Sequence, residues 1–241
     1  MKSKVKTIKL NNEQKHLVVS FFIAAYKDYI SARILLNENQ LSQGCILALT
    51  ALEKYFKGMK LILNESVPRH HDITVRKFIN SLKKNFPRLF KKVNLEFIKL
   101  LRDVYVLRYL DDVPVGYNIV LINRKLLAEL DYTINEIEVS FDIRDSKNNL
   151  LERGYQSELK WKEIKLLQNN YIALNLDKTS FIEQDSVVYE MRKMPNKEIL
   201  EVFYVTDKIK NDNIFKYEAL LPIGGFPTSS FSFAFLPKNI T

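Results

Sequence analysis

Two arginines and a tyrosine lie close together in the segment from Leu101 to Asp112. Arg102, Val106 and Tyr109 follow one another at spacings of four and three residues, which places them along one face of a helix. An arginine there can bind a phosphate through two parallel hydrogen bonds, and a tyrosine can hydrogen-bond to a base or stack on it. With Arg108 as a second guanidinium, the segment predicts a site for a phosphate-containing ligand.

A structural role is the alternative for the same arginines. Asp103, Asp111 and Asp112 lie in the same segment, and ion pairs with them would only tie helices together. Burial with carboxylate partners favours this role, whereas an open, positively charged cleft favours ligand binding.

Lys54 and Lys57 are a second pair of candidate phosphate-binding residues. They are three residues apart on a predicted helix, so one phosphate can bridge their ammonium groups. Glu53 precedes Lys57 by four residues, and the alternative is therefore a surface ion pair that contributes only a few tenths of a kcal/mol.

His70, His71 and Asp72 follow this helix. Adjacent side chains diverge and the third histidine, His16, is distant, so we expect no metal site and no cofactor. Asp72 can cap a helix that begins near Ile73, and His71 can hydrogen-bond between helices. His71 also remains a candidate catalytic residue, because an imidazole can accept and donate protons near neutral pH.

Helices must position these residues. Apolar residues recur at three- and four-residue steps, and they predict helices over about 17–36, 42–63, 74–86, 95–110 and 119–137. The face of the first helix carries Leu17, Phe21, Phe22, Ala25, Tyr29, Ala32 and Leu36. Five helices with short connections predict an up-and-down bundle.

The pattern changes to strand period near residue 139, where Val139, Phe141 and Ile143 alternate with polar residues. Further strand candidates, each bounded by polar turn residues, are Tyr171–Leu176, Val187–Arg192, Ile199–Thr206, Phe215–Leu221 and Phe231–Leu236. The predicted class is α+β, with a helical domain over 1–138 and a β-rich antiparallel domain over 139–241.

The excess positive charge lies in the helical part. The chain of 241 residues has a net charge of +9. Residues 1–140 hold 23 Lys and Arg against 14 Asp and Glu, whereas residues 141–241 hold 14 of each. Such a field attracts phosphate backbones, although a solubilising surface or a protein partner is the alternative. The cations concentrate in Lys2, Lys4, Lys6, Lys9, Arg69, Arg76, Lys77, Lys83, Lys84, Arg88, Lys91, Lys92 and Lys99.

The remaining composition predicts a cytoplasmic protein. The single cysteine, Cys45, lies in an apolar run and reads as a core residue, and a chain without a disulfide framework fits a reducing compartment. No apolar run approaches the roughly 20 residues needed to cross a bilayer, so we expect no membrane association.

Three short motifs resemble the HEPN family of small helical domains. They are A-x-x-A-x-E-K-x-x-K over residues 48–57, H-D-I over 71–73 and R-Y-x-D over 108–111. The resemblance covers about residues 15–138. It implies a bundle that commonly forms a homodimer and binds nucleotides or RNA. It also implies a setting in microbial phage defence, toxin–antitoxin pairs or RNA processing.

The catalytic motif of this family is incomplete here. Catalytic members use an arginine followed four to six residues later by a histidine, in one branch as R-x-x-x-x-H-x-Y. Arg102 and Tyr109 match that pattern, but Leu107 occupies the histidine position. The resemblance therefore implies that Arg102 and Tyr109 are remnants of a catalytic site, with binding retained and efficient cleavage lost.

Three hypotheses follow from these features. The first is a HEPN-like protein that binds RNA or a nucleotide through its basic bundle. The second is a metal-independent ribonuclease in which His71 is brought to Arg102 from a neighbouring helix or a dimer mate. The third is a dimeric interaction module that contacts a protein partner through residues 139–241.

Overall fold

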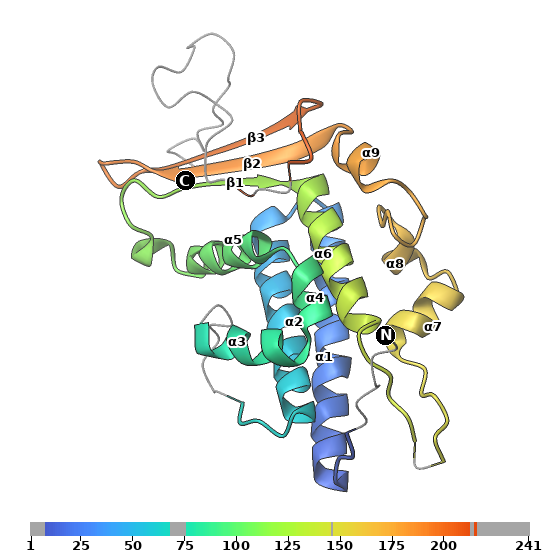
Figure 1. Cartoon of the computed structure of the whole chain (residues 1–241). Helices are drawn as coiled ribbons and strands as arrows, with labels where there is room; N and C mark the ends of the chain where they lie inside the picture. Colours follow the sequence, from blue (N-terminus) through green and yellow to red (C-terminus); the bar gives the residue numbers. More distant parts are fainter. Residues whose placement is uncertain (1–7, 68–75, 146, 213–214, 216–241) are drawn as a thin grey trace, which may run out of the picture.

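Helices make up most of the described chain (Figure 1). The computed structural model describes residues 8–67, 76–145, 147–212 and 215. Its elements are α1 (Asn12–Asn37), α2 (Leu41–Ile62), α3 (Arg76–Asn85), α4 (Pro87–Lys92), α5 (Leu95–Tyr105), the 3-10 turns η1 (Val106–Arg108) and η2 (Leu110–Asp112), β1 (Asn118–Ile122), α6 (Asn123–Glu138), α7 (Gly154–Lys160), α8 (Ile164–Leu167), α9 (Lys178–Ile182), β2 (Ser186–Lys193) and β3 (Ile199–Thr206).

The two longest helices, α1 and α2, form a tight hairpin at the centre of the bundle. Asn11 begins α1 with a capping box that it shares with Gln14. Asn39 turns the chain after α1 through a left-handed conformation, with φ of 59°. A Cβ atom at Gly58 would come within 2.8 Å of the Phe22 ring, so glycine is needed for this close approach of the helices.

The predicted helical bundle and a following β region are confirmed. Helices α1, α2, α3, α5 and α6 lie within about one or two residues of most predicted boundaries. Pro87 ends the α3 segment as expected, but the short helix α4 that begins at this residue was not predicted. Strand β3 spans the predicted residues, and β2 extends the predicted strand by one residue at each end. One residue expected on the inner face of α1 is not buried: Leu17 is 46% exposed.

The prediction of a continuous helix over 119–137 was wrong at its start. Residues 118–122 form strand β1, which pairs antiparallel with β2 so that Val120 lies opposite Glu190. The sheet order is β1-β2-β3, and the strands lie across one end of the helices (Figure 1). The sheet thus joins a strand from before residue 138 to two from after it, and the division into domains at that residue stays a prediction.

Two predicted strands are turns and helix ends instead. At the first, Val139 caps the end of α6, and only an isolated bridge between Arg144 and Leu150 follows. At the second, residues 171–175 form turns, because the Asn170 side chain accepts hydrogen bonds from the backbone N–H groups of Ile172 and Ala173, each at 3.1 Å. The predicted strand Phe215–Leu221, apart from residue 215, and the predicted strand Phe231–Leu236 lie outside the described residues.

A fully buried ion pair joins α1 to α6. Arg33 contacts both carboxylate oxygens of Asp131, and the Tyr29 hydroxyl donates to the same carboxylate at 2.8 Å. The guanidinium also donates to the carbonyl oxygens of Lys165 and Gln168 at α8. Burial raises the pKa of the Asp131 carboxyl, and Arg33 opposes that rise. Three segments are held together by this one cluster.

Within the part of the chain that the structure describes, no helix is both long and apolar enough to cross a bilayer. Helices α7, α8 and α9 lie along the side of α1 and α6 (Figure 1), so the segment between α6 and β2 covers the bundle.

Breaking the buried ion pair should destabilise the whole fold. We expect Arg33→Ala or Asp131→Ala to lower the free energy of unfolding by about 3–5 kcal/mol, because each leaves an uncompensated buried charge. Urea unfolding followed by circular dichroism measures the change. The matched control is Arg144→Ala, which removes an exposed guanidinium paired with Asp142 and should cost less than about 1 kcal/mol. Equal losses in the buried and exposed variants would contradict this assignment.

Candidate functional site

Arg102 lies on α5, whose inner face is fixed by apolar burial. The Asn94 side chain caps the helix by accepting hydrogen bonds from two backbone N–H groups of its first turn. Phe97, Leu101 and Val104 are buried against the bundle. This anchoring leaves Arg102 on the outer side of the helix, with 41% of its side chain exposed.

The helix predicted up to residue 110 ends earlier. Helix α5 stops at Tyr105, the chain continues as the 3-10 turn η1, and Tyr109 follows with φ of −131° and ψ of 84°. Arg102, Val106 and Tyr109 therefore do not form the single helical stripe expected from their spacing. With this tighter turn, the side chains of Tyr105 and Tyr109 both lie near Arg108.

Arg102 has a carboxylate partner next to it in sequence. Its Nε and Nη2 atoms donate to one Asp103 oxygen, at 2.9 and 2.7 Å. This is one of the ion pairs that the structural alternative required. Because the side chain stays partly exposed, the pair fixes the guanidinium at the surface of the bundle and does not bury it.

Arg108 lies close to two tyrosine rings. Its guanidinium carbon is 4.7 Å from the Tyr105 ring centroid and 5.5 Å from the Tyr109 ring centroid, which is cation–π geometry. The guanidinium also donates to the Tyr105 hydroxyl. Tyr109 is 58% exposed. Among the described residues, Arg108 has no ion-pair partner, so the alternative pairs with Asp111 and Asp112 are not formed.

We name Arg102, Tyr105, Arg108 and Tyr109 the arginine–tyrosine cluster. Arg102 and Tyr105 are three residues apart on α5 and therefore neighbours, and Tyr105 contacts Arg108. Tyr105 was missing from the sequence prediction. Its spacing of three residues from both arginines was the available signal.

No histidine among the described residues belongs to the cluster. Leu107 is partly buried and packs against the core, as an aliphatic side chain on a turn would. His16 lies near the start of α1, and its side chain is exposed. His70, His71 and Asp72 lie outside the described residues, so the proposed meeting of His71 with Arg102 stays a prediction.

Lys54 and Lys57 both have acidic partners within the fold. Lys57 is buried and pairs with Glu53 across one helical turn, so the predicted pair exists, but it is buried and not at the surface. Lys54 is partly buried and its ammonium group donates to Asp28 at 2.6 Å. A phosphate would have to displace a carboxylate at either lysine.

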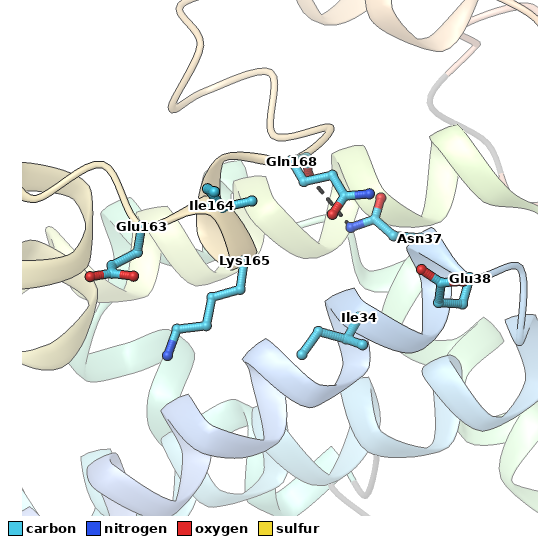
Figure 2. Close-up of a pocket in the computed structure, with 7 residues that line it drawn as sticks. All are labelled: Ile34, Asn37, Glu38, Glu163, Ile164, Lys165 and Gln168. Atoms are coloured by element: carbon cyan, nitrogen blue, oxygen red, sulfur yellow. Dashed lines mark hydrogen bonds between the residues drawn. The ribbon is translucent and has the colours of Figure 1, made fainter.

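A cavity of about 350 Å³ lies elsewhere, between the end of α1 and α8 (Figure 2). Its walls include Ile34 and Asn37 of α1 and Ile164 and Gln168 of α8. It contains none of the predicted site residues. Within the described ranges, no group of three or more His, Cys, Asp or Glu could hold a metal ion.

The described chain forms an up-and-down helical bundle with a small antiparallel sheet at one end. A family model described as HEPN domain matches residues 20–138. This match is consistent with the HEPN resemblance of the three motifs, and a HEPN domain suggests a function related to nucleotides or RNA. No curated protein and no solved structure matches the chain.

We expect the purified protein to leave RNA intact. Leu107 can neither accept the 2′-hydroxyl proton nor supply one to the leaving oxygen, although the arginines can still bind phosphate. Gel analysis of labelled RNA without added metal, with His71→Ala as the second sample, measures this. Cleavage that disappears in His71→Ala would instead establish the ribonuclease hypothesis.

Proposed function

We propose that the HEPN domain binds RNA or a nucleotide at the arginine–tyrosine cluster without cleaving it efficiently. The observation that carries the proposal is Arg108, an exposed arginine within cation–π distance of two tyrosine rings and with no ion-pair partner among the described residues. A guanidinium in that position can donate to a phosphate. The exposed Tyr109 ring offers a face on which a base can stack.

The electrostatics of the site support an anionic ligand. Stacking on two rings preorders Arg108, so less rotamer entropy is lost when a phosphate binds. Arg102, three residues before Tyr105, adds a second cation that Asp103 already orients. The net charge of the helical part adds a longer-range attraction. The family resemblance places such binding in a microbial defence or toxin–antitoxin setting, which is part of the proposal.

Removing either component of the cluster should weaken RNA binding. We expect Arg108→Ala and Tyr109→Ala each to raise the Kd for a short single-stranded RNA by roughly 5- to 100-fold, since stacking contributes about 1–3 kcal/mol per base. Fluorescence anisotropy at increasing salt measures the Kd. Arg144→Ala, an exposed arginine on the loop after α6, removes the same charge and should bind as the wild type does. Salt-insensitive or undetectable binding by the wild type would reject the proposal.

A dimeric interaction module is the second candidate function. Val19 and Ile23 lie one turn apart on α1 and are 40% and 53% exposed, and Phe203 and Val205 are exposed on β3. Exposed apolar groups of this kind are typical of protein contacts. We expect sedimentation velocity of nucleic-acid-free protein to show a dimer that Ile23→Lys weakens. A wild-type monomer at all concentrations would contradict this candidate and leave RNA binding untouched.

A further inference from the structure

Helices α3 and α4 carry a concentration of positive charge that the arginine–tyrosine cluster does not explain. The described residues 79–95 include no Asp or Glu. We name the cations in this range the basic patch: Lys83, Lys84, Arg88, Lys91 and Lys92. All five side chains are exposed or partly exposed.

Apolar side chains fix the patch to the bundle. Leu82 and Leu89 are buried, Phe86 packs against the core, and the Phe90 ring lies 5.6 Å from the Phe56 ring of α2. Because the apolar side of each short helix faces the core, the cationic side chains extend outward from a firmly attached base.

Local stability explains only part of this charge. Lys83, Lys84, Lys91 and Lys92 occupy the last turns of α3 and α4, where cations offset the helix dipole. Lys92 also pairs with Glu136 at 2.8 Å. Arg88, however, is in the first turn of α4, where the dipole disfavours a cation. Lys83, Lys84 and Lys91 have no ion-pair partner among the described residues.

Helix α5 carries one further cation, Lys99, between the patch and the arginine–tyrosine cluster, and its two acidic residues are Glu96 and Asp103. Helix α5 begins three residues after Lys92 and is about 16 Å long at 1.5 Å per residue. Lys99 is exposed on it and lies three residues before Arg102, so the two are neighbours. Helices α3 and α5 both contact α2 (Figure 1).

A single phosphate cannot engage charges spread over three helices, whereas a polymer can. We infer that the basic patch binds the phosphate backbone of a single RNA strand, one nucleotide of which occupies the arginine–tyrosine cluster. This inference rests on the proposed function and makes an RNA strand, and not a free nucleotide, the ligand. The patch supplies affinity without reading sequence, because phosphate contacts carry no base information.

The test compares two triple variants with equal charge loss. Lys83→Gln/Lys84→Gln/Lys91→Gln removes three cations of the patch. Lys160→Gln/Lys162→Gln/Lys165→Gln removes three exposed cations at α7 and α8. The probes are a fluorescent oligouridine of about 12 nucleotides, within the range of known single-strand sites, and labelled uridine monophosphate. Circular dichroism checks that both variants fold. If the patch triple variant does not fold, the double variant Lys84→Gln/Lys91→Gln replaces it.

We expect the patch variant to bind the oligomer at least tenfold more weakly at moderate salt. The slope of log K against log salt should become shallower by about 2, because each phosphate contact on a single strand contributes roughly 0.7. Binding of the monophosphate should not change, and the control triple should match the wild type.

Each other result has a definite meaning. If the patch triple binds the oligomer as the wild type does, the inference is wrong while the proposed function stands. If the wild type binds neither probe, both are wrong. If the wild type binds phosphatidylserine vesicles in place of RNA and only the patch triple loses that binding, the patch is a membrane contact and the inference is overturned.

Discussion

The buried pair of Arg33 and Asp131 is the interaction on which the architecture depends. Removing two charges from water costs several kcal/mol per ion, and the loss is recovered only if every remaining donor and acceptor is satisfied. Here the Tyr29 hydroxyl and two carbonyl oxygens at α8 complete the set. Apolar packing alone would let α6 slide along α1, whereas this pair accepts one register. The central hairpin is therefore fixed to α6, and α6 leads directly from strand β1.

The fixed position of α6 also determines where the strands of the sheet lie. Strand β1 ends at Ile122 and α6 begins at the next residue, so the position of α6 also sets the first strand. Strands β2 and β3 then pair outward from β1. Helix α5, which carries the arginine–tyrosine cluster, connects to β1 through a short segment in which the Tyr117 hydroxyl donates to the carbonyl oxygen of Asp103 at 2.7 Å. The candidate site is thus attached to the rigid part of the fold.

The sequence predicts correctly those elements whose apolar pattern fits only one kind of secondary structure. The long period of α1 and α2 fits only helices, and the run at 199–206 fits only a strand. Ile119 and Ile122 were misassigned because a three-residue step suits a helix, while pairing with β2 decided the outcome. Tyr171 was misassigned because the capping side chain of Asn170 favours a turn over a strand. Burial of the Glu53–Lys57 pair could not be read from spacing, since the same spacing serves exposed pairs and buried ones.

Phosphate binding and RNA cleavage need different chemical groups at the end of α5. Holding a phosphate needs only cations in a fixed place, and Arg108 receives that order from tyrosine rings and not from a proton-transferring partner. Cleavage needs in addition an imidazole or an equivalent group at the reacting oxygen. Leu107 contributes to the core instead, which favours a stable turn at the expense of that chemistry. Arg108 therefore has the fixed position that the proposed phosphate binding needs, whereas the neighbouring Leu107 serves packing.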